Sequence, residues 1–323
     1  MGGLAGGLLA LPFTSGAQQA ARVPRIGVLY PGKMGTGTVA MRQGLQELGY
    51  VEGRTAVIEW RWWEGKPERL RDAVAEMVRL NLDVIVVGGS EATKALKEAT
   101  RSIPIVFAGP SYPVEEGLVE SFARPGGNIT GITMAQSDHV AKMLQLLLDV
   151  APSLSDVGVI WSPANSGNTF TLRDMETAAR GLKLKLLPVA MTSDADVESA
   201  LAAITRARPG ALIVLPTSFL NTAESISGRR IGELAIRLRI PSIIASKALM
   251  ERGLLMSYGA DFRDVQQRIP SYVDRILKGA KPADMAVERP TKFELGINMK
   301  TAKAIGIAIP NSLLLRADEV IQQ

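Results

Sequence analysis

The amino-acid sequence predicts an α/β protein built from two doubly wound, Rossmann-like lobes joined by a three-crossover hinge. An apolar strand at 25–30 (RIGVLY) runs into a Gly/Pro loop and a helix, and VGVIW at 157–161 repeats this arrangement. Each is followed by a later apolar strand, in DVIVVGGS at 83–90 and ALIVLPTS at 211–218. A repeat of this size indicates a duplicated lobe rather than a solenoid unit. Continuous apolar strands that alternate with helices favour parallel sheets covered on both faces.

The first lobe is expected to alternate strands and helices. Strands are expected at 25–30, 55–60, 83–87, 104–107 and 129–133, and helices at 38–48, 67–80, 91–100 and 115–122. In the helix at 67–80, Leu70, Val74 and Met77 recur at helical spacing and form a stripe that faces the core. Pro67 stands in the first turn, where its missing N–H costs nothing.

The second lobe begins with a helix at 137–149. Strands are then expected at 157–161, 183–189, 211–215 and 241–244, and helices at 168–180, 194–206 and 222–238. The tail supplies a strand at 253–259, a helix at 261–278 and a short strand at 293–297, which return to complete both sheets. The chain then crosses between the lobes near 133, 250 and 285. The predicted lobes are 24–133 plus 251–284 and 134–250 plus 285–323, with a ligand cleft between them.

Composition is typical of a globular protein and excludes several chemistries. The 323 residues suffice for two domains, and 46% are hydrophobic and 21% charged. The net charge is +5, but no run of five basic residues occurs, so nucleic-acid binding is not indicated. The chain has no cysteine, which excludes a disulfide framework, thiolate catalysis and a Cys-ligated metal.

Residues 1–21 resemble a secretory signal and are left out of the fold prediction. Their apolar stretch GGLAGGLLALPF is shorter than the roughly 20 residues that span a bilayer. Ser15 and Ala17 occupy the small-residue positions of a cleavage site, although the basic segment that usually precedes the apolar stretch is missing. We therefore expect a signal truncated at its start and a periplasmic protein; the alternative is a disordered or wrongly started N-terminus.

Residues for enzyme or cofactor chemistry are scarce. The single histidine, His139, lacks partners for a metal site or a catalytic triad and is expected to face solvent or cap a helix. Gly32, Gly35 and Gly37 are spaced as GxxGxG, which differs from the dinucleotide-binding pattern, and there is no Walker A sequence. We expect no catalysis, no metal and no cofactor.

The candidate ligand site lies in loops at the carboxyl ends of the strands, where doubly wound sheets bind their ligands. The candidate ligand-binding residues are Tyr30, Gly32, Gly89, Ser90, Ser111, Tyr112, Asn165, Thr217, Ser218, Phe219 and Ser246. Ser90 opens a helix whose N–H groups can receive a carboxylate, or it is simply an N-cap. Tyr112 and Phe219 either stack on a planar ligand or pack at the rim.

Three tryptophans lie close together in WRWWEG. Along a strand, Trp60 and Trp62 point to one face and Arg61 and Trp63 to the other. Burial against the neighbouring helix is favoured over a place for Trp62 or Trp63 at the cleft rim.

The ordered motifs from about residue 24 onward resemble a known family. IGVLYPG, RQGLQELGYVEGR, IEWRW, DVIVVGG, IPIVFAG and RPGGNITGIT, with LMSYGADF and YVDRILKGAKPADMAVERPTKFELGINMK in the tail, resemble ABC-transporter substrate-binding proteins of the tryptophan/tyrosine-binding type. The resemblance implies a type I periplasmic binding fold and delivery of a small-molecule ligand to a membrane permease and its ATPase. It further implies a monomer that meets the membrane only through the permease.

Two departures from the family bear on the ligand. Members that take amino acids tend to carry Asp-Asn after Pro-Thr, where this chain has Ser218 and Phe219, and many have Asp-Pro-Val where it has Tyr112-Pro113-Val114. A buried ammonium would lose both carboxylates, which is costly. We therefore expect a neutral or anionic ligand, aromatic or not. The alternatives are an aromatic amino-acid-binding protein of the same type and a ligand-sensing regulator on the same scaffold, although a regulator would need an N-terminal helix-turn-helix.

Overall fold

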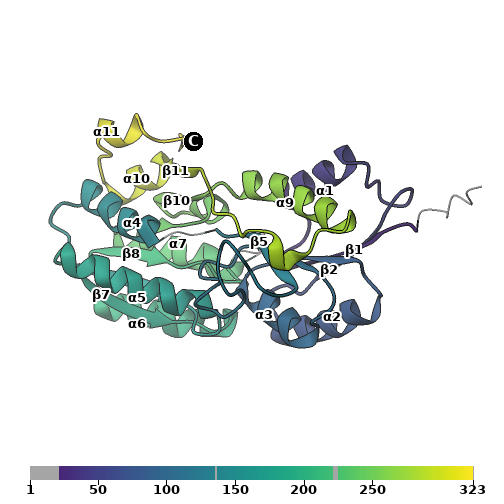
Figure 1. Ribbon diagram of the computed structural model, residues 1–323. Helices are drawn as coiled ribbons and strands as arrows, with labels where there is room; N and C mark the ends of the chain where they lie inside the picture. Colours follow the sequence, from purple (N-terminus) through teal and green to yellow (C-terminus); the bar gives the residue numbers. More distant parts are fainter. Residues whose placement is uncertain (1–21, 135–136, 221–224, 323) are drawn as a thin grey trace, which may run out of the picture.

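The computed structural model describes residues 22–134, 137–220 and 225–322. The expected signal at 1–21 and the first residues of the helix expected at 222–238 lie outside this part of the chain. The described residues form two α/β lobes, each with a largely parallel sheet and helices on both faces (Figure 1). The predicted fold class is confirmed. Within the described residues, no helix combines the length and apolar character needed to cross a membrane.

The smaller sheet has five parallel strands in the order β2-β1-β3-β4-β5. They are β1 (Arg25–Tyr30), β2 (Val57–Trp62), β3 (Val84–Gly88), β4 (Ile105–Ala108) and β5 (Ile129–Ile132). One face is covered by α1 (Thr36–Glu47) and α9 (Phe262–Leu277), and the other by α2 (Pro67–Arg79) and α3 (Ser90–Ala99) (Figure 1). Every residue of β3 is buried, as expected for a central parallel strand.

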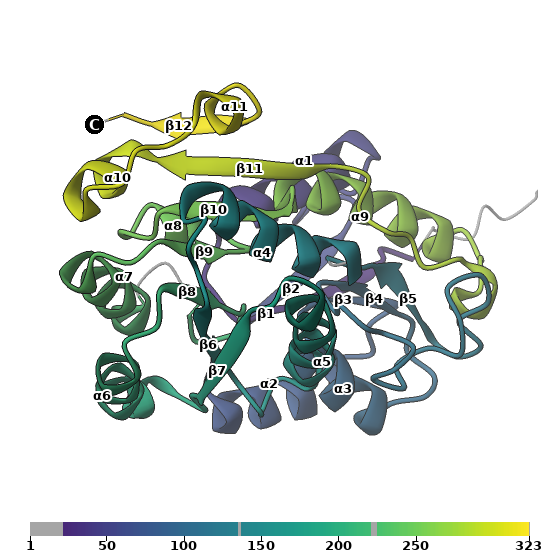
Figure 2. The same cartoon turned by 90° about the vertical axis from the view of Figure 1, so that its left-hand side faces the viewer.

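The larger sheet has the order β12-β11-β10-β9-β8-β6-β7, and β11 runs antiparallel to β10 (Figure 2). Its strands are β6 (Asp156–Trp161), β7 (Lys185–Ala190), β8 (Ala211–Val214), β9 (Ser242–Ile244), β10 (Met256–Ala260), β11 (Phe293–Asn298) and β12 (Glu319–Ile321). The helices packed on one face are α4 (Ser137–Val150), α5 (Ser166–Gly181), α10 (Met299–Ile305) and α11 (Asn311–Leu314). Those on the other face are α6 (Val197–Ala207), α7 (Ile226–Leu238) and α8 (Lys247–Met250).

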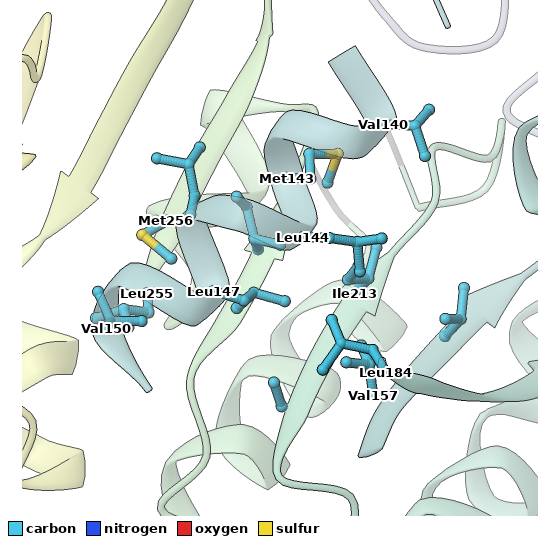
Figure 3. Close-up of a cluster of buried hydrophobic side chains, with 14 of the residues drawn as sticks. Val140, Met143, Leu144, Leu147, Val150, Val157, Leu184, Ile213, Leu255 and Met256 are labelled. Carbon is cyan, nitrogen blue, oxygen red and sulfur yellow. The ribbon is translucent and has the colours of Figure 1, made fainter. Parts of the chain in front are cut away.

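Helix α4 holds the core of the second lobe together. Its apolar side chains recur three and four residues apart, so they share one face of the helix. Figure 3 shows this face packed on side chains from the strands below it, including Val157 and Ile213. Leu144 and Leu147 of this face are completely buried. This packed face attaches α4 to the larger sheet and so places it in the second lobe.

The chain passes between the two sheets three times. The first passage follows β5, as expected, and the second lies between β10 and α9. The third follows a short 3₁₀ helix (Pro282–Asp284) and a bridge that still pairs Glu288 with Ile132 of the first lobe. Strand β10 pairs with β9 and β11, so it belongs to the larger sheet, whereas 251–284 was expected wholly in the first lobe. An apolar strand at 253–259 can complete either sheet, and its sequence does not distinguish the two.

The helix expected at 115–122 does not form. The segment makes a single turn, in which Glu116 N–H donates to Tyr112 O at 2.8 Å and Leu118 N–H donates to Pro113 O at 2.8 Å. Gly117 has a φ of +67°, a left-handed conformation that ends the turn before a helix can propagate. Four short elements were not predicted from the sequence: α8, α10, α11 and β12.

Candidate functional site

Loops at the carboxyl ends of the strands of both sheets meet between the lobes. Tyr112 is one residue of the first lobe that contacts the second lobe there. It stands in the loop after β4, and its ring lies 5.6 Å from that of Phe170 on α5. Its hydroxyl donates to Asp174 Oδ2 of the same helix at 2.9 Å. Burial raises the pKa of Tyr112 well above its ordinary value, and the Asp174 carboxylate adds to the rise. Tyr112 is therefore a contact between lobes in this conformation.

A carboxylate, Glu116, forms the second connection. Glu116 Oε1 accepts hydrogen bonds from the Ser90 hydroxyl at 3.0 Å and from Tyr112 N–H at 3.3 Å, both within the first lobe. Glu116 Oε2 accepts from the Ser166 hydroxyl of the second lobe at 2.7 Å. Burial raises the pKa of Glu116, and the two hydroxyl donors partly oppose the rise. The Ser90 hydroxyl therefore donates to a carboxylate of the protein itself, that of Glu116.

The loop after β8 lies against the first lobe. Ser218 hydrogen-bonds Glu91 of α3, and burial raises the pKa of this carboxyl group while the Ser218 hydroxyl lowers it. Gly65, which follows β2, approaches Phe219 so closely that an added Cβ would lie 2.8 Å from the Phe219 Cα atom. Backbone from the two lobes is therefore in direct contact at this point.

Hydrogen bonds within the second lobe fix the loops that follow β6 and β8. Asn165 caps α5 by accepting from Gly167 N–H at 3.0 Å. Asn165 and Asn168 both donate to Pro216 O, at 3.3 and 3.0 Å. Thr217 Oγ1 accepts from Leu220 N–H at 3.2 Å. The loop after β6 and the loop after β8 are thus held as one unit.

The remaining predicted site residues are placed less directly. The Tyr30 hydroxyl donates to Gln266 Oε1 of α9 at 3.0 Å inside the first lobe. This hydroxyl therefore already has a hydrogen-bond partner within the protein. The Phe219 side chain belongs to the apolar cluster under α6 and α7. The others are partly buried in loops at the carboxyl ends of strands: Gly32, Gly89, Ser111 and Ser246. Contact of any of these residues with a ligand stays a prediction.

The tryptophans follow the expected alternation. The rings of Trp60 and Trp62 stack with centroids 5.5 Å apart on one face of β2. Trp63 is only 2% exposed and packs in the apolar cluster that includes Leu70 of α2. For Trp63, burial against the neighbouring helix is confirmed.

His139 differs from its expected role. It is 8% exposed rather than facing solvent, and Nε2–H donates to Tyr258 O at 2.9 Å, so it does not cap its own helix. Its ring lies 5.7 Å from that of Tyr258 and 5.6 Å from that of Phe293. The expectation was wrong because the first turn of α4 packs on β10 and β11. Burial lowers the pKa of His139.

We expect acid to destabilise the protein partly through His139. Because its pKa is depressed in the folded state, the unfolded chain takes up a proton first as the pH falls through about 6.5. The free energy of unfolding then falls by at most about 1.4 kcal/mol per pH unit from this group. Urea unfolding at pH 7.5, 6.5 and 5.5 should show a smaller loss in His139→Gln than in the parent chain. Parallel losses in the two proteins would contradict this role.

Several residues that join the lobes escaped sequence reasoning. Ser166, Phe170 and Asp174 are four residues apart and share one face of α5, a signal that was present in the sequence. Glu91 directly follows Ser90 in the sequence. Glu116 comes close to Ser90 only because a turn replaces the expected helix. Two glutamates, Glu91 and Glu116, lie close to the two positions at which the family pattern has aspartates, so carboxylates are present where the lobes meet.

The structure has two doubly wound lobes, three passages of the chain between them, and polar loops of both lobes that face each other. These features define the class of two-lobed binding proteins with the type I periplasmic fold. The family model described as ABC transporter substrate binding protein matches residues 35–321. The chain therefore belongs to the family of ABC transporter substrate-binding proteins.

Individual relatives agree with this assignment. A tyrosine-binding protein of Clostridioides difficile is 23% identical over 282 residues, which cover 86% of this chain and 79% of the relative. A conserved domain protein from Vibrio cholerae superposes with a TM-score of 0.84 at 27% identity, over 93% of this chain and 100% of that one. A Streptococcus pneumoniae domain in complex with L-Trp has a TM-score of 0.84 at 24% identity, over 92% and 99%.

Proposed function

We propose that this protein is the extracytoplasmic substrate-binding component of an ABC importer, which captures a small molecule between its lobes and delivers it to a permease and ATPase. The observation that carries the proposal is the meeting of polar side chains from both lobes, Tyr112 with Asp174 and Glu116 with Ser166. Side chains that bond across a cleft distinguish a closed state from an open one. Membership of the substrate-binding family supports the transport role.

Capture works by closure of the two lobes about the three crossings. The ligand docks on one lobe, and the other closes over it because contacts made only in the closed state shift the population. In this proposal the first moving unit is the sheet of β1 to β5 with α9, and the second is the sheet of β6 to β12. A monomer suffices for this cycle.

The ligand is a small neutral or anionic molecule, as the two missing aspartates suggest. A second candidate, an aromatic amino acid, is favoured by Glu91 and Glu116, since either carboxylate could face an ammonium group. The name of the Clostridioides relative and the L-Trp bound in the Streptococcus structure point the same way.

A thermal-shift screen of residues 22–323 tests the function. The panel contains L-tryptophan, L-tyrosine, aromatic carboxylates, nucleosides and sugars. A ligand at 1,000 times its dissociation constant adds about 4 kcal/mol to stability, which raises Tm by several degrees. A hit among carboxylates or neutral molecules alone supports the first ligand class, and a tryptophan or tyrosine hit supports the second. If no small molecule raises Tm, the binding function is contradicted.

A further inference from the structure

A pocket of the second lobe lies between α7, the turn that links α8 to β10, and α10. Its volume is about 440 Å³, a size typical of small-molecule sites. Figure 2 shows α7, α8 and α10 next to one another at one side of the larger lobe. All the residues that line the pocket belong to this lobe, and none of them is a candidate ligand-binding residue from the sequence or a contact between the lobes. The pocket is therefore separate from the loops at which the lobes meet.

The turn between α8 and β10 is packed tightly on both helices that form the pocket. A Cβ added at Gly232 of α7 would meet the Arg252 carbonyl oxygen, so the turn lies directly on this helix. Arg252 Nη1 donates to Ser225 O, just before α7, at 3.4 Å. Asn298, which caps α10, donates to Met250 O at 3.2 Å. The shape of the pocket is therefore set by contacts of the main chain.

Three cationic side chains line this pocket. They are Arg229 of α7, Arg252 of the turn and Lys300 of α10, and one carboxylate, that of Glu251, accompanies them. Burial lowers the pKa of Arg252, and the charge of Arg229 adds to the fall while that of Glu251 opposes it. The two guanidinium groups therefore lie close enough to repel each other, and a bound anion would relieve this repulsion.

Two of the three cations have no ionic partner among the described residues. The ion pairs there include neither Arg229 nor Lys300, both of which are exposed. These two positive charges match a phosphate monoester, which carries a charge of about −2 near neutral pH. Ile236 and Ala304 also line the pocket and supply apolar surface for the body of such a molecule.

We propose that this pocket binds the phosphate group of a phosphate monoester, with Arg229 and Lys300 as its principal partners. A guanidinium can donate two parallel N–H groups to a phosphate, and a lysine ammonium adds a compact positive charge. The monoester is either a soluble molecule or the headgroup of a membrane lipid, since both present the same group. The site lies wholly within the second lobe, so the proposal does not rest on the transport function.

Calorimetric titration with phenyl phosphate at low salt and neutral pH tests the site. We expect Arg229→Ala and Lys300→Ala each to weaken binding at least about tenfold, the effect of losing a hydrogen bond to a charged group. The control, Arg230→Ala, removes the same charge from the next residue, whose guanidinium donates to Glu198 of α6 at 3.1 Å, and should leave the affinity unchanged. Benzoate, with a single negative charge on the same ring, should bind more weakly than phenyl phosphate.

Sedimentation with vesicles separates the two sources of the phosphate. Phosphatidylcholine vesicles that contain phosphatidic acid, a monoester, are compared with vesicles that contain phosphatidylglycerol, a diester, at the same surface charge. Sedimentation with phosphatidic acid alone, lost in Arg229→Ala, supports a lipid ligand, whereas binding of phenyl phosphate without sedimentation supports a soluble one.

The proposal is overturned if phenyl phosphate does not bind and the two kinds of vesicle sediment the protein equally or not at all. It is also overturned if Arg229→Ala and Lys300→Ala bind phenyl phosphate as tightly as the unsubstituted protein does. A ligand that raises Tm by binding in the cleft should do so equally in Arg229→Ala. Failure of the phosphate site therefore leaves the proposed transport function untouched, and a screen without hits in the cleft leaves the phosphate site standing.

Discussion

Gly65→Asn is expected to weaken ligand binding at least about tenfold, about 1.4 kcal/mol, while the protein stays folded. Gly65 has a φ of +69°, and an added Cβ would lie 2.8 Å from the Phe219 Cα atom and 2.9 Å from its amide nitrogen. Phe219 belongs to the other lobe, and its backbone cannot give way without parting the lobes. Asparagine tolerates the left-handed conformation, so the strain within the first lobe is small. The substitution therefore penalises the closed state alone.

Gly53→Asn is the matched control. Gly53 has a φ of +77°, and nothing lies within 4 Å of its added Cβ. Calorimetric titration with a ligand found in the screen should show the effect in Gly65→Asn only. The same holds for distances between spin labels on cysteines that replace Arg71 of α2 and Arg180 of α5, two exposed residues in a chain without cysteine. Unchanged affinity and unchanged distances in Gly65→Asn would mean that closure does not bring Gly65 against Phe219.

Gly131→Ala is expected to cause the largest loss of stability, about 3 kcal/mol or more from overpacking and backbone strain together. Gly131 stands in β5 opposite Phe107 of β4, with a φ of +151°. Its added Cβ would lie 2.1 Å from the Phe107 carbonyl oxygen, which is backbone held in the sheet. The sheet would have to part locally to accommodate the methyl group.

Differential scanning calorimetry checks this expectation. A loss of about 3 kcal/mol corresponds to a fall in Tm of roughly 6–12 °C for a domain of this size. Gly127→Ala, two residues before β5, is the control because nothing lies within 4 Å of its added Cβ. A Tm for Gly131→Ala within a degree of the control would show that β5 relaxes more easily than its geometry implies.

Most of the fold could be predicted because buried parallel strands and amphipathic helices leave strong periodic signals. The strand at 25–30 was placed to the residue, and the helix expected at 67–80 differs by one residue at its end. The sheet that β10 joins could not be predicted, because the sequence of an apolar strand does not show which of two sheets it pairs with. The helix expected at 115–122 failed because a left-handed glycine outweighs helical composition.

The candidate site was predictable in its loops but not in its contacts. The rule that ligands bind at carboxyl ends of strands led to Ser90, Tyr112 and Ser218, which do lie where the lobes meet. Glu116 depends on the exact path of a turn, and Asp174 lies two helical turns inside α5. Such pairings across two lobes arise from the tertiary arrangement, which local pattern does not encode.

The return of α9 to the first lobe bears on the order in which this protein can fold as it is synthesised. All five strands of the smaller sheet are complete once residue 132 has left the ribosome. Met41 and Leu45 of α1 nevertheless pack in the same cluster as Val265 and Ile269 of α9, which emerge more than two hundred residues later. Because such distant contacts carry a large entropic cost, folding is slow until they form. The nascent chain therefore carries an uncovered apolar face until synthesis is nearly finished.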